Sequence, residues 1–208
     1  LILLGAAAMT AADADLDASI ARHRMGTLVI KTTPGAKVSV EQLRHEFWFG
    51  STLPTHVFNG QLPAEQAARF KELFVQLFNA AVIENSFKWH AMEPQRGQVN
   101  YAVVDEMLAW ADKENIPVRG HCLFWGVPNW VPAWVKPLGD DELRMVLQQR
   151  ARSVTACYRG RFAEYDLNNE MIHGNFFEQR LGPEITKQMA LWAKEGDPNA
   201  RLFVNDYE

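Results

Sequence analysis

The sequence repeats one pattern, in which a short apolar segment ends in polar or aromatic residues and a longer segment with helical spacing follows. The apolar segments predict five strands, at residues 44–52, 81–83, 117–124, 162–167 and 201–204. Between them, apolar residues recur at helical intervals. Strands that alternate with helices form a parallel sheet covered by helices. The sequence therefore predicts an α/β fold.

Two features distinguish between the common parallel-sheet folds. No glycine-rich phosphate-binding motif follows the first predicted strand, which disfavours a dinucleotide-binding sheet. Every predicted strand ends in polar or aromatic residues that could bind or react with a substrate, as the strands of a (β/α)8 TIM barrel do. Such a barrel has eight strands, and an open one leaves two unpaired edges. The 208 residues therefore predict a TIM barrel that is truncated after about the fifth strand.

Composition narrows the class of ligand. With 48% hydrophobic and 22% charged residues, the chain is globular. Its net charge of -4 offers no basic surface, so we expect no nucleic-acid partner. Cys122 and Cys157 are too few for a disulfide framework or a paired metal motif. Seven Trp and twelve Phe residues suit flat, partly apolar ligands such as sugar rings.

The first residues have the composition of a targeting segment. Residues 1–14, LILLGAAAMTAADA, look like the end of a secretory signal peptide, too short to span a membrane. We therefore expect a secreted or periplasmic protein without a membrane anchor; a plain alanine-rich terminus is the alternative. Residues 15–43 are predicted to form a small β extension, with two short strands around a turn at Pro34 and Gly35.

The fourth predicted strand carries the strongest functional signal. Its apolar run ends abruptly in Asn168, Asn169 and Glu170. Successive strand residues point to opposite faces, so Asn169 and Glu170 share a pocket only where the strand is ending. A glutamate beside an amide suits general acid or base catalysis on a hydroxyl-rich substrate. The alternative is a cap on the following helix.

Other strand ends add candidates for substrate contact. They are Glu84, Asn85, Lys88, His121, Trp125 and Tyr207. Structural roles remain open for two of them, because Lys88 could be a solvated charge and His121 a buried core histidine. We interpret Trp130 and Trp134, which lie among prolines, as loop packing, and Glu93 as a structural residue.

Five stretches, taken together, resemble glycoside hydrolase family 10, the endo-β-1,4-xylanases. They are ENSFKW at 84–89, MEPQRG at 92–97, VRGHCLFW at 118–125, YDLNNE at 165–170 and FVNDY at 203–207. Their order and spacing are those of the family, over roughly residues 20–208. The form NNEMIHG and the β extension are similar to the plant-type branch. The resemblance implies that residues 44–208 are the N-terminal part of a catalytic barrel.

The resemblance also implies a function. It is that of a retaining endo-β-1,4-xylanase, a monomer that acts on xylan or xylo-oligosaccharide without a cofactor or metal. Glu170 matches the general acid/base, and Asn169 matches the amide that binds the 2-hydroxyl of the sugar at the cleavage point. His121 and Trp125 match residues that line this sugar.

The remaining matches lie on either side of that sugar. Glu84, Asn85 and Lys88 match the polar residues that hold the next sugar toward the non-reducing end. Tyr207 matches an aromatic residue that flanks the sugar on the leaving side.

The sequence departs from the family in three places. The family's nucleophile is a glutamate on the seventh strand, beyond residue 208, and neither Asp206 nor Glu208 stands in a matching position. We therefore expect the 208-residue chain alone not to hydrolyse xylan. Gly126 replaces a histidine that many members carry after the tryptophan. Glu208 stands where asparagine is usual.

Three other functions remain open. A barrel hydrolase could use a metal held by His121, His173 and Asp206. A non-catalytic carbohydrate-binding or inhibitor-like protein could keep the groove without the reaction. A retaining hydrolase could also act on another β-glycan, such as a mixed-linkage glucan.

Overall fold

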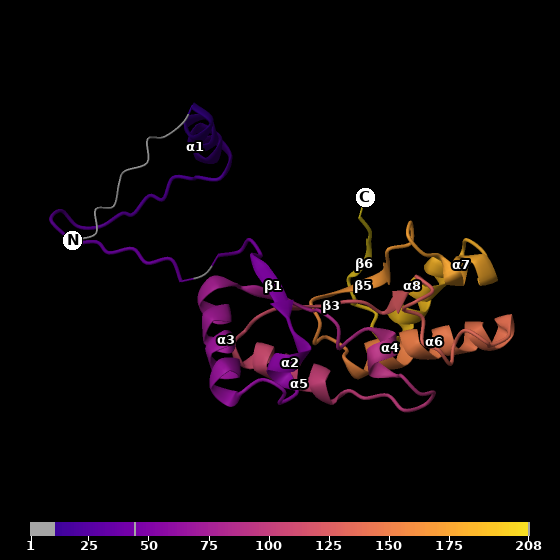
Figure 1. Cartoon of the computed structure of the whole chain (residues 1–208). Coiled ribbons are helices and arrows are strands. Elements are labelled where there is room, and N and C mark those ends of the chain that lie inside the picture. Colours follow the sequence, from indigo (N-terminus) through magenta and orange to yellow (C-terminus); the bar gives the residue numbers. More distant parts are fainter. Residues whose placement is uncertain (1–10, 44, 208) are drawn as a thin grey trace. The chain divides into compact units, whose positions relative to one another are not determined.

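The computed structural model describes residues 11–43 and 45–207, which fall into two compact units, Leu1–Leu43 and Arg44–Glu208 (Figure 1). The first unit contains helix α1 (Ala11–His23). Of the predicted signal segment, residues 1–10 lie outside the described residues.

The predicted β extension is wrong in its strands. The turn at Pro34 and Gly35 forms, with the amide of Ala36 donating to the carbonyl of Thr33 and a φ of 82° at Gly35. However, the structure assigns no strand to residues 24–43. The apolar side chains of this segment, such as Leu28 and Val40, are exposed. Two short strands without a core to cover are marginally stable, so alternation alone did not produce a hairpin.

The second unit is built on a parallel sheet, as predicted. Its strands are β1 (Gly50–Leu53), β2 (Ala80–Ile83), β3 (Val118–Gly120), β4 (Phe124–Trp125), β5 (Glu164–Asn169) and β6 (Leu202–Asn205). All the pairs between them are parallel. β3 pairs with the start of β5 and β4 with its end, so together they are the third predicted strand, and β6 pairs with β5 on the other side.

Except between β3 and β4, helices connect successive strands. They are α2 (Thr55–Phe58), α3 (Ala64–Leu77), α4 (Trp89–Met92), α5 (Ala102–Lys113), α6 (Asp140–Cys157), α7 (Phe176–Leu181) and α8 (Ile185–Gly196). The four long ones, α3, α5, α6 and α8, were predicted from apolar spacing. The three short ones were not, because a single helical turn is too short to show a period.

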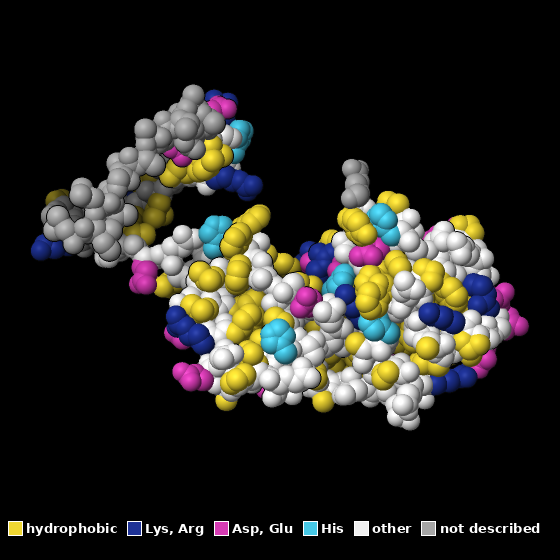
Figure 2. Space-filling view, in the orientation of Figure 1, with side chains coloured by type: hydrophobic (Ala, Val, Ile, Leu, Met, Phe, Trp, Pro, Cys, Tyr) yellow, Lys and Arg dark blue, Asp and Glu magenta, His cyan; other side chains and the backbone are white. Residues whose placement is uncertain are grey.

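The core lies between the sheet and these helices. Phe87, Phe162 and Tyr165 pack their rings together, with centroids 4.9 to 6.0 Å apart. The side chains of Phe203 and Val204 on β6 stay exposed because this strand is an edge of the sheet. Figure 2 shows His and charged side chains interleaved with hydrophobic ones over the middle of this unit. Of the helices in the described residues, none is long and apolar enough to span a bilayer.

Helices α6 and α8 lie side by side and are tightly packed at Gly196. A Cβ atom there would lie 2.0 Å from Oγ1 of Thr155 and 2.5 Å from the carbonyl oxygen of Arg152. The crossing of the two helices therefore depends on the missing side chain.

We predict that Gly196→Ala lowers the free energy of unfolding by at least about 2 kcal/mol, because the helices must separate. Urea unfolding measures this change. Gly26→Ala is the matched control, since a Cβ there meets nothing within 4 Å. Equal stability of the two variants would contradict the close crossing.

Candidate active site

Glu170 occupies the point at which β5 leaves the sheet. Its φ is 54°, in the left-handed region, and its amide donates to the carbonyl of Asn205 in β6 (2.7 Å). Its own carbonyl accepts from the amides of His173 and Gly174. The left-handed turn ends the strand alternation directly after Asn169. This fulfils the condition under which Asn169 and Glu170 can face one pocket.

The side chain of Glu170 is joined to groups from two other strand ends. Nε1 of Trp125, at the end of β4, donates to Oε2 of Glu170 (2.9 Å). Nζ of Lys88, which follows β2, lies 4.5 Å from the ring centre of Trp125 and donates to Oδ1 of Asn85 (2.9 Å). The structure thus brings together Asn85, Lys88, Trp125 and Glu170. We call these four residues the strand-end cluster.

Two aromatic residues that the sequence did not single out for the site extend this cluster. The ring of Trp130 stacks on that of Trp125 at 5.0 Å and 8°, and 45% of its surface is exposed. His90 lies against Trp130 at 5.2 Å. Burial and the positive charge of Lys88 hold the pKa of His90 below its usual value. In the sequence, the position of His90 two residues after Lys88, near the same strand end, could have indicated that it belongs to the site.

Trp134 packs within its loop, as predicted, whereas Trp130 packs on Trp125 of the strand-end cluster. Nε1 of Trp134 donates to the carbonyl of Glu93 (2.9 Å), and its ring packs edge-on against Trp89. The carboxylate of Glu93 accepts from Nε1 of Trp89 and from the amide of Gly97, both at 2.8 Å. Glu93 is therefore structural, as predicted.

His121 is oriented by a buried carboxylate. Its Nδ1 lies 2.8 Å from Oδ2 of Asp166, and Arg119 forms ion pairs with both Asp166 and Glu164. Burial raises the pKa of Asp166, but hydrogen bonds from His121 and Arg119 outweigh it and hold the pKa below its usual value. An ionised Asp166 accepts a hydrogen bond from Nδ1–H of His121, which leaves Nε2 as the ring nitrogen available to a ligand.

Asn169 carries an unsatisfied donor. Its Oδ1 accepts from Nδ2 of Asn205 (2.7 Å), and its side chain is buried. Among the described residues, its Nδ2 has no hydrogen-bond partner. A buried amide donor without a partner is costly, unless a ligand supplies the acceptor. Asn205 holds this amide in place. It lies in the stretch FVNDY at 203–207, but the sequence did not single it out as a site residue.

Tyr207 and Glu84 have exposed side chains. Tyr207 is exposed and stacks on His173 at 4.0 Å, and the carbonyl of Tyr207 accepts from Nε2 of His173 (2.8 Å). Asp206 accepts from the amides of Ile172 and Tyr207, so it holds this loop. The side chain of Glu84 is exposed. Among the described residues, the side chains of Tyr207 and Glu84 form no hydrogen bond, ion pair or ring contact with Glu170.

Gly126 has a structural reason to lack a side chain. A Cβ there would lie 2.9 Å from the carbonyl oxygen of Gly174, and a Cβ on Gly174 would lie 2.3 Å from Cα of Val127. The amide of Phe176 also donates to the carbonyl of Gly126 (3.0 Å). The two glycines let the loop after Glu170 lie directly on the loop after Trp125.

The metal hypothesis needs His121 beside His173 and Asp206, but the structure pairs His121 with a different carboxylate. His121 is bonded to Asp166, whereas His173 lies 3.8 Å from Asp206. Within residues 11–43 and 45–207, no group of three or more His, Cys, Asp or Glu residues could hold a metal ion. The geometry therefore does not form the proposed ligand set.

We predict that Asp166→Asn destabilises the protein at neutral pH by about 3 kcal/mol, because Arg119 and His121 lose a buried partner. The folded pKa of Asp166 is depressed, so its contribution is present above the unfolded pKa of about 3.9 and is lost as the pH falls through the folded value. The difference from wild type should therefore narrow from about pH 5 downward.

Unfolding followed across this pH range measures the effect. Asp112→Asn is the control, since it removes an exposed ion pair with Arg161 and should cost less than about 1 kcal/mol. A difference for Asp166→Asn that stays constant down to low pH would contradict the assignment.

Comparison with known proteins identifies relatives that are similar to this chain in sequence. Over 173 residues, the chain is 38% identical to endo-1,4-beta-xylanase 1 of Arabidopsis thaliana, covering 83% of the chain and 18% of that protein. Over 176 residues, it is 38% identical to the anti-sigma-I factor RsgI6 of Acetivibrio thermocellus, covering 85% and 22%. The chain thus spans about a fifth of the length of these curated relatives.

A solved structure agrees with the fold. Xylanase 10B from Thermotoga petrophila RKU-1, in complex with xylobiose, superposes with a TM-score of 0.70 at 26% identity, covering 77% of the chain and 50% of that barrel. The sheet is therefore the matching part of a TIM barrel. The sequence model of Glycosyl hydrolase family 10 matches residues 42–208. The chain belongs to glycosyl hydrolase family 10.

Proposed function

We propose that the full-length protein containing this chain is a retaining endo-β-1,4-xylanase that hydrolyses internal bonds of xylan or xylo-oligosaccharide. The observation that carries the proposal is the hydrogen bond from Trp125 to Glu170 at the junction of three strand ends. Family membership and the xylanase names of its relatives support the substrate class. The protein is a secreted or periplasmic monomer, with no nucleic-acid partner, cofactor or metal in this reaction.

Glu170 acts as the general acid/base. It protonates the leaving glycosidic oxygen, and later removes a proton from the attacking water. Trp125 holds one carboxylate oxygen, so the carboxyl group meets the substrate in one orientation. A hydrogen bond of this kind contributes about 0.5–1.5 kcal/mol, which favours one rotamer of the Glu170 side chain.

Asn169 supplies the amide donor for the 2-hydroxyl of the sugar at the cleavage point. Asn205 occupies its oxygen, which turns the unpaired Nδ2 toward a ligand acceptor. A hydrogen bond to the 2-hydroxyl strengthens as positive charge develops on the sugar ring. His121, held through Nδ1 by Asp166, offers Nε2 to the same sugar, and Trp125 lines it with an apolar edge.

Neighbouring sugars are held by groups on either side. Lys88 and Asn85, already bonded to each other, bind the next sugar toward the non-reducing end together with Glu84. Tyr207 flanks the sugar on the leaving side, with one ring face covered by His173.

The nucleophile is a glutamate beyond residue 208. Retention needs a second carboxylate about 5–5.5 Å from the acid/base. Asp206 is engaged with main-chain amides, and Asp166 with Arg119 and His121. Neither is free to attack a sugar, so the isolated 208-residue chain is inactive. Measurable xylan turnover by that chain would refute this point.

A second candidate is a regulatory protein that binds carbohydrate. The similarity to a protein named as an anti-sigma factor favours it. The retained Glu170 and its hydrogen bond favour the enzyme. A retaining hydrolase of another β-glycan is the remaining alternative within the enzyme class.

The function is tested by assaying the full-length protein on xylan beside Glu170→Gln. We expect release of reducing ends by the wild type and its loss in the variant. An aryl xyloside with a good leaving group, supplied with azide, should restore part of the rate, because azide needs no general base. Xylan binding without turnover by the wild type would favour the regulatory candidate.

We predict that Asn169→Ala lowers kcat/KM about 100-fold, because a donor that strengthens in the transition state is lost. A 2-deoxy xyloside should be a poor substrate for the wild type. For Asn169→Ala, the 2-deoxy and normal substrates should react at similar rates, since the variant has no donor left to distinguish them. Full discrimination by the variant would overturn this role.

A further inference from the structure

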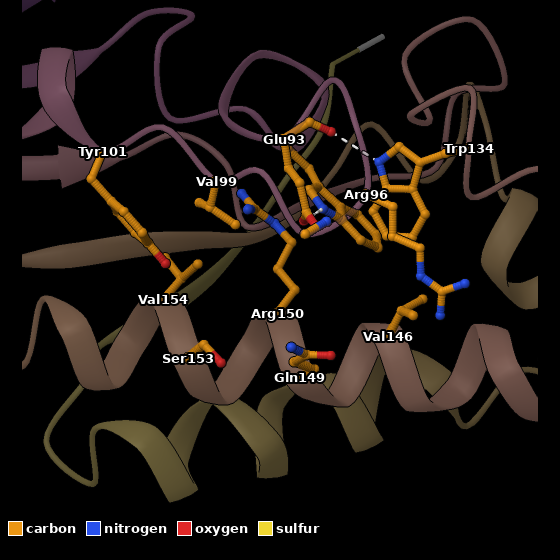
Figure 3. A pocket seen from close by; sticks show the side chains of 12 residues that line it. Glu93, Arg96, Val99, Tyr101, Trp134, Val146, Gln149, Arg150, Ser153 and Val154 are labelled. Atoms are coloured by element: carbon orange, nitrogen blue, oxygen red, sulfur yellow. Dashed lines mark hydrogen bonds between the residues drawn. The ribbon is translucent and has the colours of Figure 1, made fainter.

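A cavity of about 310 Å³ lies between helix α6 and the loop that joins α4 to α5 (Figure 3). Its lining includes Glu93, Tyr101, Trp134, Gln149, Arg150 and Ser153. None of the strand-end cluster residues lines it. The cavity therefore differs from the proposed active site in both position and lining.

The aromatic walls of the cavity are fixed in place. Figure 3 shows Tyr101 and Trp134 on opposite sides of Arg150. Trp134 is held through Nε1 by the carbonyl of Glu93, and Tyr101 packs against the buried ring of Tyr158. A wall that needs no reordering lowers the entropy cost of binding. The cavity is thus a preformed pocket with two flat apolar surfaces.

The charges around the cavity balance. Arg150 is 4% exposed and donates to the carbonyls of Leu123 and Phe87. Both oxygens of Glu93 accept hydrogen bonds, and at the rim Arg96 pairs with Glu142 (2.7 Å). With Glu142, which pairs with Arg96 from outside the lining, two positive and two negative groups surround the pocket, so it does not select an ion. It favours a neutral ligand.

Three groups in the lining are available for hydrogen bonding. Gln149 and Ser153 come from α6 and line the cavity (Figure 3). Within the described part of the chain, neither side chain has a hydrogen-bond partner, and neither does the hydroxyl of Tyr101. An amide and two hydroxyls can each donate and accept, as the hydroxyl groups of a sugar do.

We propose that this cavity is a second carbohydrate site, which takes a single pyranose unit outside the catalytic groove. Its volume lies at the lower end for small-ligand pockets, about 300 Å³, which suits one ring. The apolar face of the ring packs on Trp134 or Tyr101, while Gln149 and Ser153 bind its hydroxyls. The choice of xylose as that unit rests on the proposed function.

The NMR signals of three indole N–H groups report ligand binding at the two sites separately. Those of Trp89 and Trp134 border the cavity and donate to Glu93, whereas that of Trp125 donates to Glu170 in the groove. We would titrate methyl β-xyloside into the full-length protein and follow these N–H signals by NMR. The expected result is a saturable shift of the Trp89 and Trp134 signals with an affinity different from that at Trp125.

The test variant is Ser153→Leu, which fills the cavity from an exposed helix position. It should weaken the Trp89 and Trp134 titration about tenfold or more, about 1.4 kcal/mol, without changing that of Trp125 or kcat/KM on xylo-oligosaccharide. Gln149→Ala should also weaken it. Gln179→Ala, an exposed helical glutamine outside the cavity, should not.

The outcomes distinguish this inference from the proposed function. Absence of a shift at Trp89 and Trp134, or shifts equal in wild type and Ser153→Leu, would overturn the second site. A silent Trp125 signal together with absent hydrolysis would instead count against the proposed function, while a response at Trp89 and Trp134 would still support the cavity as a sugar site.

Discussion

The geometry of the site depends on one backbone constraint, the left-handed conformation of Glu170 at the end of β5. The ladder with β6 holds Asn169 opposite Asn205, and the carbonyl of Asn205 then accepts the amide of Glu170. This contact turns the chain out of the sheet immediately after a buried asparagine. As a result, the carboxyl group meets the indole of Trp125, which comes from the neighbouring strand. A shift of one residue in this register would send both side chains to the wrong faces.

Two further contacts keep the neighbouring loops in place. The facing glycines Gly126 and Gly174 let the loops after Trp125 and Glu170 touch through their backbones. Asp166 binds Arg119 on β3 and His121 in the segment between β3 and β4, which joins β5 to both. The absence of a histidine at position 126 follows from this packing. The same sheet edge thus combines a rigid backbone with side chains that retain unsatisfied hydrogen-bonding groups.

Much of the fold could be predicted because the apolar residues of each long helix and strand recur at the spacing typical of that element. The four long helices and the parallel sheet follow from that pattern, whereas the strands expected in residues 27–43 alternate correctly but have no core to cover. In the site, Asn169, Glu170, Lys88 and Trp125 could be named from their strand ends. The stacking of Trp130, the place of His90 and the anchoring by Asn205 depend on contacts between distant segments, which sequence spacing does not encode.

We propose that this chain supplies the acid/base half of a retaining site. The most direct measurement is the anomeric configuration of the first product, followed by proton NMR as the full-length protein cleaves xylo-oligosaccharide. Retention predicts that the β-anomer appears first and then mutarotates, because the sugar passes through a covalent intermediate. Initial appearance of the α-anomer would contradict the account, since it would mean direct displacement by water.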